Sequence, residues 1–147
     1  MGRHSNYKEN RPRDNWPTVD PSSVKPLIPF VKGLNFYEPC IGDGSLVNLL
    51  REGGVNCVGG SDIEPIGEGV KKDATKLTEK DVEGADCFIT NPPFSWDMLQ
   101  PMLESLPKLR PTWLLLPSGF MFNKRSAKYM AKCDRDWETM LSKLWNS

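Results

Sequence analysis

The residues best suited to chemistry form one short segment, Asn91-Pro92-Pro93-Phe94, which follows the apolar run at 87–89 and Thr90. A proline after Asn91 disfavours helical backbone angles at that residue, and neither proline has an N–H to donate. We therefore expect a rigid loop at the tip of a buried strand. The amide oxygen of Asn91 and the carbonyl oxygen of Pro92 can accept hydrogen bonds from an NH2 group, and Phe94 can stack on the flat ring that carries it.

Such a loop could activate an aromatic amine. The lone pair of this amine is delocalised into its ring, which makes the nitrogen a poor nucleophile. Two acceptors placed out of the ring plane draw the nitrogen towards a tetrahedral, nucleophilic form. The alternative interpretation is a proline-rich turn after a core strand, because short motifs have high false-positive rates.

A glycine turn lies earlier in the chain, between a predicted strand at 34–37 and a predicted helix at 46–50. Gly42 and Gly44 permit a tight turn and let a ligand approach the backbone, while the helix N-terminus offers N–H groups to a carboxylate. The full GxGxxG pattern of dinucleotide-binding proteins is missing. Glu38-Pro39, just before the turn, is the more particular feature.

Acidic residues follow the next two predicted strands. Asp62 ends the strand beginning at Val55, at the position where such folds bind two ribose hydroxyls. Glu64 is the competing residue, but it lies deeper in the turn, behind Ile63. Asp73 ends a predicted third strand and can accept from an adenine amino group; its alternative role is a helix cap or turn residue.

The elements that position these residues alternate between strands and helices. Helices are expected at 21–33, where Pro26 and Pro29 weaken the pattern, at 46–50, and from Ser95 to Leu106 with a kink at Pro101. Strands are expected at 34–37, 55–60, 70–74, 86–90 and 113–117. This order predicts an α/β fold with an open, doubly wound, mostly parallel Rossmann-like sheet that binds its ligand above the carboxyl ends of the strands.

Composition limits the class of protein. The 147 residues fit one domain, with 38% hydrophobic and 26% charged residues. No apolar run approaches the length of a membrane span and no signal peptide is visible, so we expect a cytoplasmic protein. Four widely spaced cysteines without a CxxC pair, and a single histidine, His4, argue against a metal site, a disulfide framework and a histidine-based triad.

The net charge is zero, yet the charges are unevenly distributed. Residues 33–107 carry thirteen acids against five basic residues, which could suit a cationic cofactor, while both ends of the chain are basic. If nucleic acid binds, we expect phosphate contacts from two clusters. These clusters are Arg11 with Arg13, and Lys124 with Arg125 and Lys128. The alternative is ordinary solvated surface.

Three segments are predicted: a flexible basic arm at 1–15, the main domain at 16–132, and an amphipathic helix of the same domain at 133–147. An apolar stripe defines this last helix. Its members are Trp137, Met140, Leu141, Leu144 and Trp145. We expect the stripe to cover the fifth strand, within one chain or by exchange in a homodimer; the alternative is ordinary docking on the sheet face.

Together these segments resemble S-adenosylmethionine-dependent amino-methyltransferases of the NPPY/NPPF class, the adenine-N6 DNA methyltransferase type, over about Asp14 to Met130. The stretch Asp14–Thr18 is similar to the segment over the methionine end of the cofactor, and Glu38–Gly44 to the first cofactor motif. The resemblance implies catalytic roles for Asn91, Pro92, Pro93 and Phe94. It implies cofactor binding by Thr18, Glu38, Pro39, Cys40, Gly42, Gly44, Asp62, Ile63, Asp73, Ala74 and Asn91.

The implied activity is methyl transfer to adenine N6 in DNA, leaving S-adenosylhomocysteine, with the adenine turned out of the duplex. Relatives with this motif modify RNA or a protein glutamine, so these substrates stay open. The chain departs from the family after Pro117, where about thirty residues stand in place of further strands and a recognition region. A cofactor-binding module, or a shortened methyltransferase that needs a partner, is therefore the other hypothesis.

Overall fold

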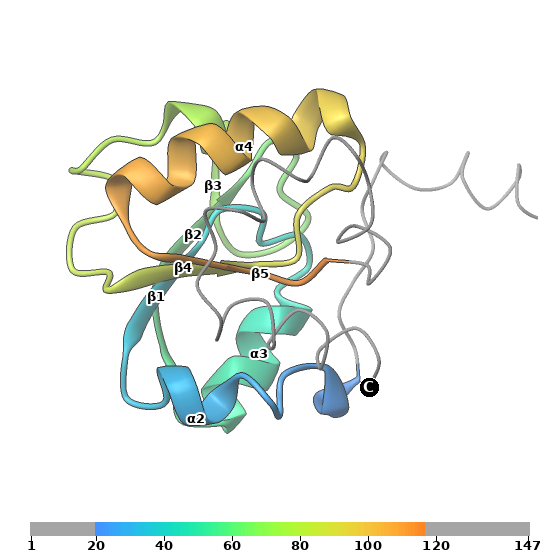
Figure 1. Ribbon diagram of the computed structural model, residues 1–147, viewed down its shortest axis with the longest axis vertical. Coiled ribbons are helices and arrows are strands. Elements are labelled where there is room, and N and C mark those ends of the chain that lie inside the picture. Colours follow the sequence, from blue (N-terminus) through green and yellow to red (C-terminus); the bar gives the residue numbers. More distant parts are fainter. Residues whose placement is uncertain (1–19, 117–147) are drawn as a thin grey trace, which may run out of the picture.

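The computed structural model describes residues 20–116, which form a parallel sheet between two helical layers (Figure 1). The strands are β1 (Asn35–Glu38), β2 (Asn56–Asp62), β3 (Val70–Lys71), β4 (Cys87–Thr90) and β5 (Thr112–Leu114). Their spatial order is β3-β2-β1-β4-β5, and each neighbouring pair is parallel. The first strand, β1, lies in the middle of the sheet, with β2 and β3 on one side and β4 and β5 on the other. This is the Rossmann-like α/β fold that the sequence predicts.

The helices cover both faces of the sheet. They are α2 (Ile28–Val31), α3 (Ser45–Glu52) and α4 (Trp96–Leu109), with short 3-10 turns η1 (Pro21–Ser23) and η2 (Ala74–Lys76). Figure 1 shows α4 on one face and α2 with α3 on the other. Parallel strands covered on both faces are buried on both sides, which explains why β4 is buried throughout.

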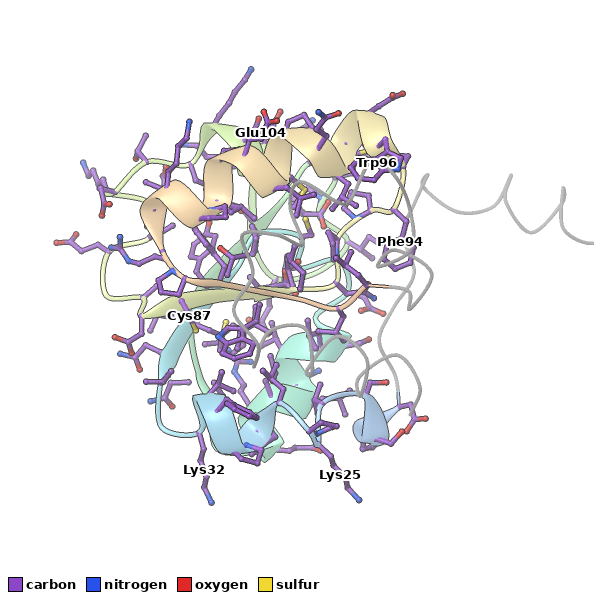
Figure 2. All side chains as sticks on the ribbon, in the orientation of Figure 1. Lys25, Lys32, Cys87, Phe94, Trp96 and Glu104 are labelled. Carbon is purple, nitrogen blue, oxygen red and sulfur yellow. The ribbon has the colours of Figure 1, made fainter. Side chains whose placement is uncertain are left out.

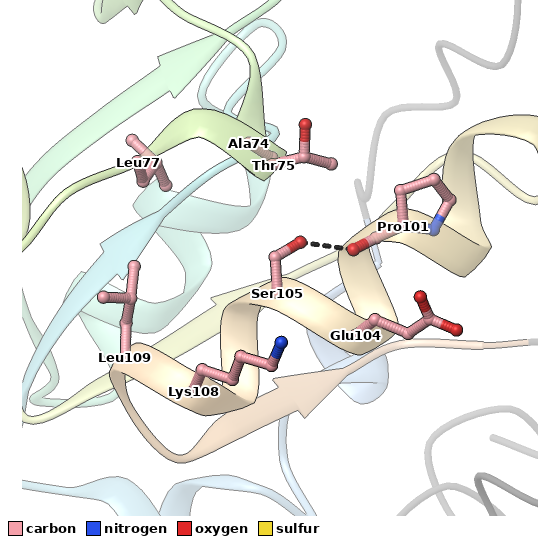
Figure 3. A pocket seen from close by; sticks show the side chains of 8 residues that line it. All are labelled: Ala74, Thr75, Leu77, Pro101, Glu104, Ser105, Lys108 and Leu109. Carbon is pink, nitrogen blue, oxygen red and sulfur yellow. Dashed lines mark hydrogen bonds between the residues drawn. The ribbon is translucent and has the colours of Figure 1, made fainter.

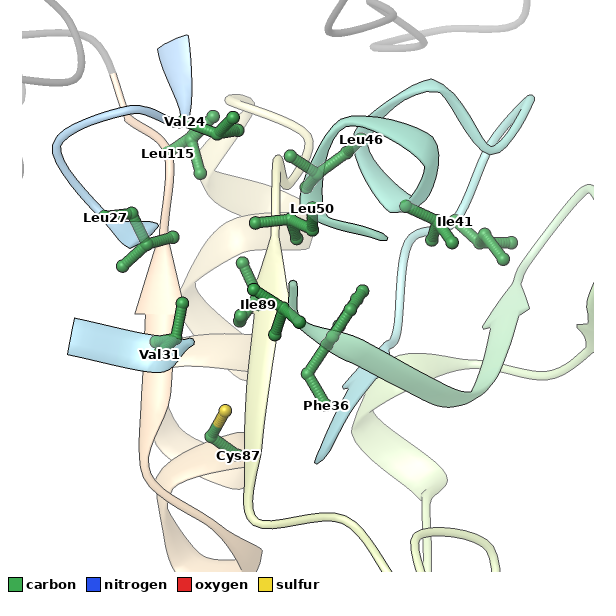
Figure 4. Close-up of a cluster of buried hydrophobic side chains, with 12 residues drawn as sticks. Val24, Leu27, Val31, Phe36, Ile41, Leu46, Leu50, Cys87, Ile89 and Leu115 are labelled. Atoms are coloured by element: carbon green, nitrogen blue, oxygen red, sulfur yellow. The ribbon is translucent and has the colours of Figure 1, made fainter. Parts of the chain in front are cut away.

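Two hydrophobic cores result from the alternation of side chains along β1. Phe36 points towards α2 and α3, where it packs with Leu27, Leu50 and Ile89 (Figure 4). The next residue, Tyr37, belongs to the other core and packs edge-on against Phe88, with ring centroids 6.1 Å apart. The second core also contains Met102 and Leu106 of α4. The central strands are therefore fixed from both faces.

The predicted helix at 21–33 is wrong in its extent. The segment instead forms η1, a turn and the four-residue helix α2. Pro26 and Pro29 have no N–H to complete a regular helical ladder, so the chain cannot stay helical throughout. The burial pattern survives this break, because Val24, Leu27 and Val31 all lie in the core.

The third strand is shorter than predicted and ends before Asp73. Only Val70 and Lys71 pair with β2, opposite Ser61 and Asp62. Asp73 instead caps η2, and its Oδ1 accepts hydrogen bonds from the N–H of Thr75 at 2.8 Å and its hydroxyl at 2.7 Å. Capping is the alternative role expected for Asp73, and the element that it caps is the short turn η2. An aspartate that can bond the backbone two residues ahead favours such a turn over a strand.

Helix α4 runs continuously through Pro101 and Pro107, with Ser95 at the predicted N-cap position. Leu99, Met102 and Leu106 are its buried residues. Burial of this face against the sheet compensates for the helical hydrogen bonds that the prolines cannot make. Within residues 20–116, no helix combines the length and apolar content that spanning a bilayer would require.

Strand β5 lies at one edge of the described sheet. The apolar tail expected to cover it lies outside the described residues, as do the basic arm and both basic clusters. Deleting residues 136–147 should cause self-association, visible by light scattering, because an uncovered edge strand pairs with other chains. Deleting the polar residues 2–13 is the control and should change little. A tail-deleted protein that stays monomeric and equally soluble would contradict the expectation.

Candidate functional site

The described residues contain three buried polar or charged side chains, and all three lie at the carboxyl ends of the central strands. Glu38 ends β1, Ser61 is the penultimate residue of β2, and Thr90 ends β4. Glu38 is 1% exposed, and the other two are fully buried. Buried polar side chains are the informative exceptions to the rule of apolar interiors. Their gathering at the edge where such folds bind ligands marks this edge as the candidate site.

Backbone N–H groups of the glycine turn donate hydrogen bonds to the end of β2. The N–H of Ile41 donates to the carbonyl of Ser61 at 2.9 Å, and the N–H of Gly42 donates to Oδ2 of Asp62 at 2.9 Å. Gly44 then opens α3 with a φ of 84°, a left-handed conformation that glycine adopts without strain. The structure therefore brings together the glycine turn and Asp62, which are separate in the sequence.

Asp62 ends β2, as predicted, and its carboxylate serves the local backbone. Besides the bond from Gly42, Oδ1 accepts from the N–H of Glu64 at 2.9 Å. Each carboxylate oxygen can accept a second bond, so the group keeps capacity for a ligand hydroxyl. Ile63 follows with 49% of its surface exposed, a large apolar side chain beside the site. Glu64 is exposed.

Glu38 is the most perturbed carboxyl at the site. Burial raises its pKa to about 8, and the nearby charge of Asp62 raises it further, while the Thr90 hydroxyl and a hydrogen bond from the N–H of Cys40 (2.9 Å) oppose the increase. The described residues provide it with no ion pair. A buried carboxylate without a cation is costly, so this carboxyl is largely protonated at neutral pH.

Two hydroxyls at the carboxyl ends of the central strands are buried without a hydrogen bond. The Ser61 hydroxyl lies near Tyr37 and the Thr90 hydroxyl near Glu38, but neither meets hydrogen-bond geometry with a described residue. Such atoms call for an explanation in a native structure, and an expected ligand is one. Sequence reasoning missed both residues. The sequence signal that could have identified them is their position at the end of a predicted strand, where Ser61 directly precedes Asp62 and Thr90 directly precedes Asn91.

The Asn91–Phe94 loop leaves the end of β4 as predicted. Pro92 and Pro93 are buried and anchor the loop, while Asn91 and Phe94 are only partly buried. Figure 2 shows Phe94 and Trp96 beyond the carboxyl end of the sheet, near the start of α4. The two prolines are thus packed inwards, and the Oδ1 atom of Asn91 is itself buried although the residue as a whole is partly exposed.

Asp73 and Ala74 lie farther along the same edge, at the start of η2. A groove of about 410 Å³ extends from Ala74 between η2 and α4 (Figure 3). Its polar side chains belong to Thr75, Glu104, Ser105 and Lys108, and Ser105 donates to the carbonyl of Pro101. The groove does not include Glu38, Ser61 or Thr90, so it is distinct from the buried cluster.

The remaining predicted site residues divide into two groups. Thr18 lies outside the described residues, so its role stays a prediction. Pro39 and Cys40 belong to the turn, and the sulfur of Cys40 lies 3.9 Å from that of Met102. Burial, followed by the charge of Glu38, raises the pKa of the Cys40 thiol well above its usual value. Within residues 20–116 no group of three His, Cys, Asp or Glu side chains could hold a metal ion.

Comparison with known proteins gives little beyond this geometry. No family model matches the chain, and no curated protein sequence matches it. A solved structure from Streptococcus pneumoniae TIGR4, described as a provisional NADH-flavin reductase, is similar with a TM-score of 0.47 and 14% identity. The similarity covers 78% of this chain and 63% of that protein, so this chain spans less than two thirds of its length.

Proposed function

We propose that this protein transfers a methyl group from S-adenosylmethionine to an exocyclic amino group, adenine N6 in DNA, in the cytoplasm. The observation that carries the proposal is the buried carboxyl of Glu38, close to a Thr90 hydroxyl that has no hydrogen bond, at the strand edge that also bears the Asn91 loop. A carboxyl in this setting would gain a partner from a cationic ligand, because an opposite charge favours its ionised form. S-adenosylmethionine carries both a sulfonium and an ammonium group.

The residues of the site fit this cofactor. When bound, it would supply a methyl group activated by the positive sulfur. Asp62 has free acceptor capacity for ribose hydroxyls, and Ile63 offers an exposed apolar side chain to the adenine. Gly42 and Gly44 leave the backbone of the turn approachable. Asp73 retains one carboxylate oxygen outside its bonds to Thr75, which could accept from the adenine amino group.

The chain's contribution to methyl transfer would be positioning. The Asn91 amide oxygen and the Pro92 carbonyl would accept the two protons of the substrate amine, and Phe94 would stack on its ring. The nitrogen would form its bond to carbon as the carbon–sulfur bond breaks, with the bonding pair leaving on sulfur. The proton that the nitrogen then sheds can pass to water, so no general base is needed. Holding two reactants in line accounts for most of the rate gain in such a scheme.

The experiment that tests this function pairs two measurements on the full chain. Calorimetry with S-adenosylmethionine should show binding, and a radiolabelled methyl-transfer assay should show incorporation into adenine-containing DNA. RNA and protein substrates form the other arms of the assay. Transfer to RNA or protein alone would correct the substrate, whereas binding without transfer to any of them would favour a cofactor-binding module. Absence of binding would contradict the proposal as a whole.

Replacing Asp62 with alanine should weaken S-adenosylmethionine binding by about 1.5–3 kcal/mol, the usual range for hydrogen bonds to a charged group. Titration calorimetry measures the loss. Glu64→Ala is the matched control, because Glu64 is exposed and only its backbone N–H contacts Asp62. Equal affinity of the Asp62 variant and the wild type, or a larger loss in the control, would move the ribose contact away from Asp62.

A further inference from the structure

Thr90 lies between the two parts of the proposed site, the buried carboxyl of Glu38 and the loop that begins at Asn91. β1 and β4 pair in parallel, with Phe36 opposite Cys87 and Tyr37 opposite Phe88. Continuing this register by one residue sets Glu38 beside Ile89, so Thr90 lies one step beyond the carboxyl on the adjacent strand. The N–H of Leu115 donates to the Thr90 carbonyl at 2.9 Å, which fixes its backbone to the segment after β5. Thr90 immediately precedes Asn91, and its fully buried hydroxyl lies close enough to the Glu38 carboxyl to lower the pKa of that group.

The charges around Glu38 explain why a hydroxyl is useful there. The titratable groups near it are Asp62 and the Cys57 thiol from β2 and the Cys40 thiol from the turn after β1, with Asp73 close to the Cys40 thiol. β4 contributes the uncharged Thr90, and α4 contributes Met102, which contacts Cys40. None of these groups is a cation, so an ionised Glu38 can gain only hydrogen bonds from the described residues.

We propose that Thr90 is a positioning residue whose hydroxyl donates to the second carboxyl oxygen of Glu38 when a cationic cofactor ionises that carboxyl. The first oxygen already accepts from the N–H of Cys40. Binding would therefore release the carboxyl proton to water, and the ionised carboxylate would be held by the cofactor, the Cys40 N–H and the Thr90 hydroxyl. This inference rests on the proposed function. It adds that cofactor binding is coupled to proton release from Glu38, and that Thr90 determines the pH range of this coupling.

The state without cofactor provides an independent signature. There the Thr90 hydroxyl is buried without a hydrogen bond, which costs stability relative to an apolar group of similar shape. Thr90→Val should consequently unfold at the same temperature as the wild type or at a higher one. A residue whose removal stabilises the free protein but weakens ligand binding serves the ligand rather than the fold.

Calorimetry with S-adenosylmethionine on the full chain tests the linkage, at pH values from 6 to 9 and in two buffers with different ionisation enthalpies. Wild-type affinity should rise about tenfold per pH unit at low pH and level off near pH 8, with nearly one proton released at pH 7. Glu38→Gln should lose the Glu38-linked proton release. Thr90→Val should bind about tenfold more weakly at pH 7 and level off at a higher pH, and Thr90→Ser should restore both values.

Each outcome decides a separate point. No wild-type binding at any pH contradicts the proposed function itself. Binding with equal affinity at pH 6 and pH 9 and no proton release contradicts only the linkage. If Thr90→Val weakens binding without moving the pH at which affinity levels off, or melts well below the wild type, the hydroxyl has a structural role and the inference is wrong. Thr90→Ala tests the same hydroxyl should the valine variant not fold.

Discussion

Replacing Asn91 with alanine is expected to lower methyl transfer by about 100- to 1000-fold or more, the loss typical of removing one group that stabilises a transition state. Affinity for S-adenosylmethionine should stay close to that of the wild type. The reason is that Asn91 starts the proline loop beyond the end of β4, and the proposed function assigns its amide to the substrate amine rather than to the ribose or the carboxyl cluster.

The measurement is a single-turnover transfer assay on the substrate identified, with cofactor affinity determined in parallel. Asn48→Ala is a suitable control, since Asn48 is an exposed asparagine on α3. It should keep wild-type values in both assays. Near-normal turnover of the Asn91 variant would show that amine activation comes from elsewhere. A large loss of cofactor affinity would instead place Asn91 in the cofactor site.

The second large effect concerns stability. Because burial raises the pKa of Glu38 from 4.5 to about 8, the folded protein keeps a proton between these pH values that the unfolded chain has lost. The unfolding free energy contributed by this group is therefore full below pH 4.5 and falls as pH rises towards 8. The total loss is on the order of 3–5 kcal/mol. Glu38→Gln cannot ionise and should lack this decline.

Urea unfolding at pH 5, 7 and 9 measures the effect. The stability gained by Glu38→Gln relative to the wild type should grow from pH 5 to pH 9. Glu52→Gln is the matched control, because Glu52 is exposed at the end of α3 and its replacement should leave the pH dependence unchanged. If the Glu38 variant and the wild type show parallel stability curves, the carboxyl is ionised and accommodated by a partner.

The sequence by itself determined where the strands lie and which end of the sheet carries the polar residues. Short apolar runs that stop at glycine, proline or aspartate are local signals, and a side chain at a strand terminus stays there whatever packs around it. The strand at 34–37, the acid at the end of β2 and the proline loop after β4 were therefore predictable. The alternation of strands and helices was enough to give the parallel α/β fold.

Tertiary structure decided how these residues interact. Asp73 leaves the expected strand because its carboxylate caps η2, and α4 continues through two prolines because its apolar face is buried against the sheet. The pKa of Glu38 and the isolation of the Ser61 and Thr90 hydroxyls depend on neighbours that the chain supplies from three different strands. Burial and electrostatic environment are properties of these long-range neighbours, so no local pattern in the sequence could have given them.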